Sequence, residues 1–134
     1  MNTEKLRWQA IVTQYAQSDL RKSIWQVVNT LVPYFVLFYL SMISLEISFW
    51  LALPLIILTA GFMVRTFIIF HDCGHGSFFK SQKANTWLGR VTGLLTFTPY
   101  YRWSHDHAIH HATAGDLDRR GTGDVYTIRL PCDA

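Results

Sequence analysis

The sequence predicts an all-α membrane protein built on one transmembrane helical hairpin, with a histidine-rich region on one side of the membrane. Half of the 134 residues are hydrophobic and only 16% are charged. The apolar residues are concentrated in two blocks, at about 27–45 and 49–70, and a helix of either length can cross a hydrocarbon core of about 30 Å once. All six histidines follow the second block, and five of them form two clusters. This concentration of apolar residues is typical of a membrane protein and not of a globular core.

The chain divides into three segments. Residues 1–26 carry apolar side chains at helical spacing among polar ones, which predicts an amphipathic helix at the membrane surface, with a polar tail as the alternative. Residues 27–70 hold the two crossings, joined by a link of three to four residues around Glu46. Residues 71–134 form the histidine-bearing region, and the apolar segment 87–101 within it is too short to cross, so we expect it to lie in the interface. A buried helix pair of a soluble domain is the alternative for the two blocks.

Basic residues flank the two crossings on one side of the membrane only. Lys5, Arg7, Arg21 and Lys22 precede the first block, Lys80, Lys83 and Arg90 follow the second, and the link carries only Glu46. The positive-inside rule therefore predicts a multi-pass integral membrane protein whose termini and histidines all face the cytoplasm. The net charge is +3, but no basic run with interleaved aromatic residues indicates a nucleic-acid partner.

The histidines have the spacing of metal ligands on helices. His71 and His75 stand at positions i and i+4, and His107, His110 and His111 stand at i, i+3 and i+4. Residues at these spacings share one face of a helix. Two such imidazole faces brought together would form a nitrogen-rich site for a transition metal. Surface histidines with no common task are the alternative.

Further polar residues are candidates for orienting these ligands. His105 stands two residues before His107, so a helix points it to the opposite side, and we expect a supporting role for it. Each ligating imidazole needs an acceptor for its other N–H group. The available carboxylates are Asp72, Asp106, Asp116 and Asp118, and a solvated acid is the alternative for each of them. Imidazole suits iron, zinc and copper alike, so the ligands alone do not choose the metal.

The two clusters and their flanks resemble the histidine boxes of membrane fatty acid desaturases of the Δ12/ω6 acyl-lipid type. The stretch 71–79 (HDCGHGSFF) looks like the first box, and the stretch from Trp103 through His111 to Asp118 resembles the second. The resemblance implies two non-haem iron ions held by histidines, with no catalytic residue beyond the ligands. It also implies O2 as co-substrate, a donor such as ferredoxin or a cytochrome, and a cis double bond formed in the acyl chain of a membrane lipid or acyl-CoA.

Desaturases of this family carry a third histidine box and a second membrane hairpin further downstream. This sequence has no histidine after His111. We therefore expect it to correspond to the N-terminal half of a four-crossing desaturase, to bind metal weakly and not to desaturate by itself.

Two other functions stay open. Another membrane di-iron oxygenase, such as a carotenoid ketolase or hydroxylase, a sterol hydroxylase or an alkane hydroxylase, has similar boxes, although residues 76–79 and 115–118 favour the acyl-lipid group. A non-catalytic membrane metal-binding protein is the second alternative, but transporters place ionisable ligands inside the spanning helices and these histidines follow them.

Overall fold

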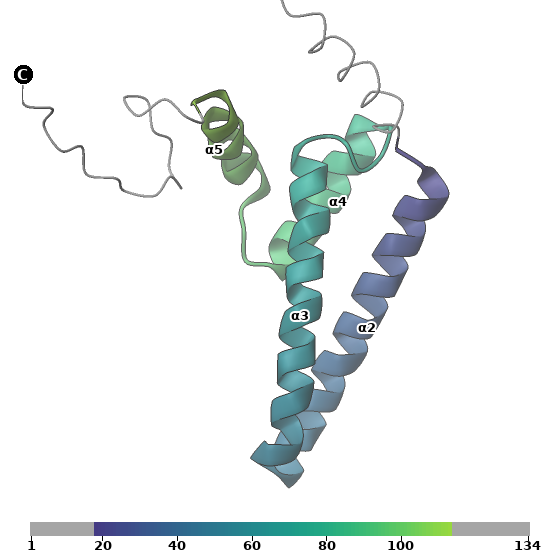
Figure 1. The fold of residues 1–134 in the computed structure, drawn as a ribbon, viewed down its shortest axis with the longest axis vertical. Coiled ribbons are helices and arrows are strands. Elements are labelled where there is room, and N and C mark those ends of the chain that lie inside the picture. The colour runs from purple at the N-terminus through teal and green to yellow at the C-terminus, as the bar shows by residue number, and fades with distance from the viewer. Residues whose placement is uncertain (1–17, 114–134) are drawn as a thin grey trace, which may run out of the picture. The chain divides into compact units, whose positions relative to one another are not determined.

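A computed structural model describes residues 18–113, and these residues are helical with no strand (Figure 1), which confirms the all-α class. The helices are α2 (Leu20–Ile47), α3 (Phe49–Gly74), α4 (Gln82–Leu95) and α5 (Tyr100–Thr113). The chain forms two compact units, residues 1–100 and residues 101–134. Each unit is described by itself.

Both long helices have the length and composition of membrane spans. At 1.5 Å per residue, the 28 residues of α2 and the 26 of α3 extend for roughly 40 Å each, which exceeds a hydrocarbon core of about 30 Å. The helices therefore continue past the apolar blocks. At the start of α2, the Asp19 carboxylate accepts hydrogen bonds from the backbone N–H groups of Arg21 (2.9 Å) and Lys22 (3.3 Å), so the helix begins well before the apolar residues do.

Ser48 alone separates α2 from α3, a shorter link than the sequence led us to expect. Its backbone is extended (φ −164°, ψ 133°), and this one residue reverses the chain direction. Its N–H group donates to the Ser44 carbonyl (2.9 Å) and so closes the last turn of α2. The result is a tight hairpin of two apolar helices that diverge from the link in Figure 1.

Small buried side chains lie along both helices of the hairpin, and in α3 they are spaced by seven residues. We call them the seam residues: Ser23, Thr30, Ser41 and Ser44 in α2 and Ala52, Thr59, Thr66 and Cys73 in α3. A seven-residue period keeps one face of a helix against its partner, and small residues let the backbones approach closely. The hydroxyls of Thr59 and Thr66 donate to carbonyls of their own helix (2.7 and 2.9 Å), so they add no unsatisfied polar group.

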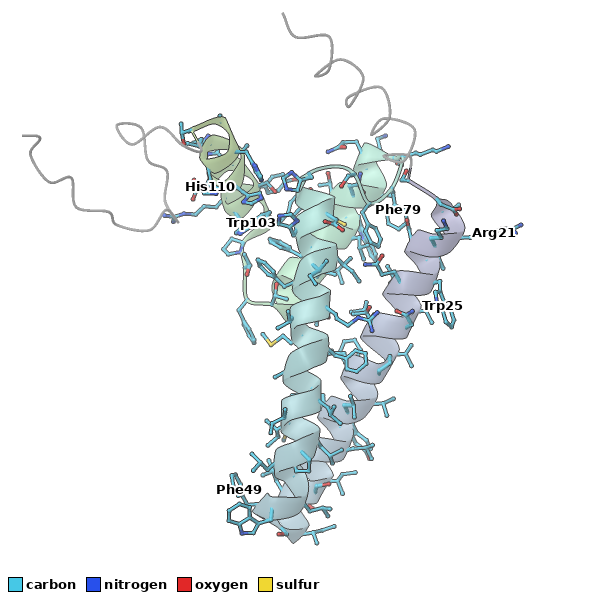
Figure 2. All side chains as sticks on the ribbon, viewed as in Figure 1. Arg21, Trp25, Phe49, Phe79, Trp103 and His110 are labelled. Carbon is cyan, nitrogen blue, oxygen red and sulfur yellow. The ribbon has the colours of Figure 1, made fainter. Side chains whose placement is uncertain are left out.

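Large apolar side chains point away from the seam. Trp25 lies on the side of α2 that faces away from α3 (Figure 2), and exposed Val64 and Ile57 are comparable positions on α3. In a soluble protein, so large an exposed apolar surface would be unusual. The hairpin is thus built with its small residues inside and its large residues outside, as expected in a bilayer.

Overfilling this seam should loosen the hairpin. Thr66→Leu inserts a larger side chain at a fully buried position, and we expect it to lower the free energy of unfolding by about 1–3 kcal/mol. The measurement is separation of α2 and α3 in mixed micelles of rising SDS content, followed by energy transfer between labels on the two helices. The control is Val64→Leu, which adds the same kind of side chain on the exposed face. If both variants lost the same free energy of unfolding, tight packing of small residues between α2 and α3 would be contradicted.

α4 packs against α3 after a short loop. Gly76 has a φ of +68°, a left-handed conformation that favours glycine, and it turns the chain away from α3 directly after His75. Buried Asn85 then fixes the loop, because its amide accepts from the Phe79 N–H group (2.7 Å) and donates to the Phe79 carbonyl (2.9 Å). The Ser23 hydroxyl donates to the neighbouring Phe78 carbonyl (2.7 Å). These contacts hold the end of α3, where the first histidines lie, against both α2 and α4.

Candidate metal centre

The first histidine pair lies at the carboxyl end of α3. His71 is in the last turn of the helix, and His75 follows directly with a helical backbone (φ −75°, ψ −9°). The His75 N–H group donates to the His71 carbonyl (3.1 Å), so the helical spacing extends to His75. The two rings therefore face each other, with their Nε2 atoms 3.3 Å apart and their centroids 4.5 Å apart.

The carboxylate of Asp72 lies beside the His71 ring and favours one of its tautomers. Its Oδ1 lies 3.2 Å from His71 Nδ1. An ionised carboxylate can only accept hydrogen bonds, so this contact favours the neutral tautomer with the proton on Nδ1 and the lone pair on Nε2. This is the tautomer in which a histidine binds a metal while a carboxylate orients it. The available lone pair points toward His75.

The second pair lies on α5, in the other unit. His107 and His111 are one turn apart, their Nε2 atoms are 3.1 Å apart and their ring centroids are 4.5 Å apart. Trp103 stacks on His107 from the preceding turn, with centroids 4.3 Å apart and ring planes inclined by 18°. The His110 ring lies farther off, at 6.1 Å from His107 and 5.8 Å from His111. Figure 2 marks Trp103 and His110 on this helix. α5 thus brings His107 and His111 together as a pair, with His110 beside them.

The other candidate residues lie differently. His105 Nδ1 is 3.4 Å from Asp106 Oδ1, and Arg102 Nε is 3.9 Å from Asp106 Oδ2. Asp106 is therefore engaged with His105 and Arg102. Asp116 and Asp118 lie outside the described residues.

Each pair has the geometry of two ligands on one ion. Metal–nitrogen bonds to histidine are about 2.0–2.1 Å long, so an ion bound to two nitrogens 3.1–3.3 Å apart would have a bond angle of roughly 95–110°. Such an angle suits tetrahedral and octahedral coordination alike. Two imidazole nitrogens this close also need a shared cation or proton, because two facing lone pairs repel each other. The residues present therefore fit a transition metal.

The first pair is supported by a contact that sequence reasoning did not single out. Tyr100, the first residue of α5, donates from its hydroxyl to the Cys73 carbonyl between His71 and His75 (3.0 Å). Its ring packs on Phe70 with centroids 6.0 Å apart, and it lies so close to Gly89 that a Cβ atom there would overlap it. The glycines at 89 and 93 were the one available sequence signal, because glycines four residues apart on a helix permit close approach of another element.

Removing the Tyr100 hydroxyl should loosen the end of α3. Tyr100→Phe loses a buried hydrogen bond worth about 1 kcal/mol. We expect the buried Cys73 thiol to react several-fold faster with a maleimide, measured in a Cys132→Ser background. Tyr101→Phe, the same change at the next and exposed residue, is the control. Unchanged labelling of Tyr100→Phe would show that this hydrogen bond does not hold the turn.

Known proteins similar to this chain are fatty acid desaturases. The model of the family "Fatty acid desaturase" matches residues 48–129, which include both histidine pairs. The chain is 49% identical over 119 residues to the "Fatty acid desaturase" of Bacillus subtilis, covering 89% of this chain and 34% of that protein. It is 39% identical over 70 residues to the "sn-1 acyl-lipid omega-3 desaturase (ferredoxin)" of Synechocystis sp., covering 52% and 20%. It is 35% identical over 77 residues to the "Omega-3 fatty acid desaturase, endoplasmic reticulum" of Nicotiana tabacum, covering 57% and 20%.

No solved structure matches the chain. The chain spans about a third of the length of the Bacillus relative and about a fifth of the other two. The family model covers more than half of the chain, it includes both histidine pairs, and the matched helix α3 has the composition of a membrane span. The resemblance predicted from the two histidine clusters is therefore confirmed, and the chain belongs to the fatty acid desaturase family.

Proposed function

We propose that this chain supplies two histidine boxes to an O2-dependent desaturase that introduces a cis double bond into an acyl chain. The observation that carries the proposal is the pairing of Nε2 atoms, 3.3 Å apart at the end of α3 and 3.1 Å apart on α5. The test is a chimera in which this chain replaces the matching part of the Bacillus subtilis relative, expressed in a strain without its own desaturase. A new unsaturated fatty acid in the lipid profile supports the proposal, and a folded chimera that makes none contradicts it.

We propose that the metal is non-haem iron, as two ions, and that His71, His75, His107, His110 and His111 are the ligands. The iron would supply O2 activation, because no acid, base or nucleophile in this chain can attack an unactivated C–H bond. The protein's own part is to orient the ligands. Asp72 holds the Nδ1 proton of His71, and the stacked Trp103 ring restrains the rotation of His107. Asp72, Asp106, Asp116, Asp118 and His105 are the proposed supporting residues.

We propose an acyl chain of a membrane lipid as the substrate and ferredoxin as the electron donor, with acyl-CoA and a cytochrome as the alternatives. The Synechocystis relative, whose name specifies an acyl-lipid substrate and ferredoxin, supports the first choice. The hairpin supports it too, because exposed apolar side chains cover α2 and α3 up to the level of the first histidine pair. An acyl chain that lies in the bilayer could approach this histidine pair without leaving the bilayer. The desaturases among the relatives favour this function over other di-iron oxygenases.

We propose that residues 27–70 cross the membrane twice and that both ends of the hairpin face the cytoplasm. Residues 1–26 and 87–101 would then lie at the interface, and residues 71–134 would form the cytoplasmic histidine region. The charges support this topology. Arg21 and Lys22 lie in the first turn of α2, Lys80 and Lys83 follow α3, and Glu46 lies at the opposite end near the link.

Labelling of intact cells tests the orientation. Gln82→Cys places a thiol at the exposed first residue of α4, and we expect an impermeant maleimide to label it only after lysis. Ile47→Cys, at the exposed link end, is the matched control and should label in intact cells. Both variants carry serine in place of the native cysteines. The reverse labelling pattern would show the opposite orientation.

A further inference from the structure

The outer face of α4 carries a stripe of basic and large apolar side chains. Asn85, Leu88, Gly89, Thr92 and Gly93 form the buried face of this helix. The opposite face presents Lys83, Trp87, Arg90 and Leu94, which fall within roughly 60° of one another around the helix axis. Trp87 is 68% exposed and Leu94 is 77% exposed, and Phe97, just beyond the helix, is 87% exposed. Polar residues would be expected at these positions if only water contacted them. The exposed apolar side chains therefore indicate contact with a membrane or another protein.

Basic side chains outnumber acidic ones on this part of the molecule. The sequence has no acidic residue between Asp72 and Asp106, whereas Lys80, Lys83 and Arg90 are all exposed. Arg21 and Lys22 reach the same level, because Ser23 is hydrogen-bonded to the Phe78 carbonyl. We call Arg21, Lys22, Lys80 and Lys83 the basic collar. The carboxylates of the same unit near it are already engaged, Asp19 with the first N–H groups of α2 and Asp72 with His71.

The stripe is basic at the start of α4, beyond the end of α3, and apolar at the end of α4, beside the apolar part of α3. The start of α4 is tied to Phe79, beyond the end of α3, through Asn85. The end of α4 lies beside Phe70 of the apolar helix, because a Cβ atom at Gly93 would lie 3.0 Å from the Phe70 ring. α4 therefore runs back along α3 (Figure 1). Its basic end lies past His71 and His75, and Leu94 and Phe97 lie next to the membrane-spanning part.

We propose that the outer face of α4 and the basic collar dock onto an anionic phospholipid leaflet. The collar and Arg90 bind lipid phosphates, Trp87 lies at the headgroup boundary, and Leu94 and Phe97 reach the acyl chains. Tryptophan and basic side chains are typical of this boundary, and each Lys or Arg near an anionic surface adds favourable binding. The docking rests on the membrane crossing of α2 and α3 proposed above and adds the charge of the lipid surface, and it requires neither metal nor activity.

Lipid selectivity of the reconstituted chain tests the docking. The whole chain is placed in phosphatidylcholine bilayers that contain trace spin-labelled phosphatidylglycerol or phosphatidylcholine, and the motionally restricted fraction of each label is measured. We expect a preference for phosphatidylglycerol that falls by on the order of fivefold for each basic side chain removed in Lys80→Gln/Lys83→Gln. Lys80→Arg/Lys83→Arg keeps the charge and should keep the preference. A glutamine variant that matches wild type, or a wild type with no preference, would overturn the proposal.

Depth measurements provide a second test that does not depend on lipid charge. Spin labels are attached at Lys83→Cys and Leu94→Cys, with serine in place of Cys73 and Cys132, and their collisions with O2 and with a water-soluble nickel chelate are compared. We expect the Leu94 label to be richer in O2 collisions and the Lys83 label to be richer in chelate collisions. Equal collision rates at the two positions, or the reverse order, would contradict a docked α4 whose end lies deeper in the membrane than its start.

Discussion

Alanine in place of His71, His75, His107, His110 or His111 is expected to abolish desaturation in the chimera with the Bacillus subtilis relative. Each variant removes a proposed ligand, and loss of supporting partners around a metal already costs about 10–100-fold in affinity or activity, so loss of a ligand should cost more. The measurement is the fatty acid profile of a host that lacks its own desaturase. Unsaturated product from His75→Ala or His111→Ala at the unmodified level would contradict the assignment.

His105→Ala is the matched control for these five substitutions. It removes a histidine from the same helix as His107 and His111, but its Nδ1 faces Asp106 at 3.4 Å and its ring is exposed. We expect this variant to keep appreciable activity. If it were as inactive as His107→Ala, the assignment of His105 to a supporting role would be wrong.

The 134 residues expressed by themselves are expected to form no double bond. Five histidines would give two iron ions fewer than three imidazole ligands each on average, and the family resemblance implies a further box. Such a site would be open and would hold iron weakly. Fatty acid profiling of the same host, with the chimera as the positive control, measures this. A clear new monoene or diene peak from residues 1–134 would show that these residues suffice.

The architecture was predictable because membrane spans are encoded in composition. Two apolar blocks of spanning length predicted the hairpin, and the structure contains α2 and α3 at these positions. The helix ends were less predictable, because local groups set them: the Asp19 cap extends α2 beyond the apolar block, and Ser48 alone forms the link. The seven-residue period of small residues in α3 is visible in the sequence. Only the packed hairpin shows that it marks the seam.

The candidate site was predictable where one helix sets the geometry. Residues at i and i+4 meet on a helix whatever surrounds it, so the sequence predicted the contacts within His71–His75 and His107–His111. The contact of Asp72 with His71 is also local. In contrast, the Tyr100 hydrogen bond to Cys73 joins residues 27 positions apart and forms only in the packed fold. No local pattern encodes this contact.

Iron analysis tests most directly whether these histidines hold the metal of a desaturase. The chimera, its His71→Ala/His107→Ala variant and its His105→Ala variant are purified without oxygen after growth with iron, and iron per chain is measured. We expect about two iron ions per chain in the unmodified chimera, as in a two-metal site, and in His105→Ala, with little iron in the double variant. Helix content by circular dichroism shows that the double variant is folded. A folded double variant that retains the iron of the unmodified chimera would contradict the metal centre proposed for this chain.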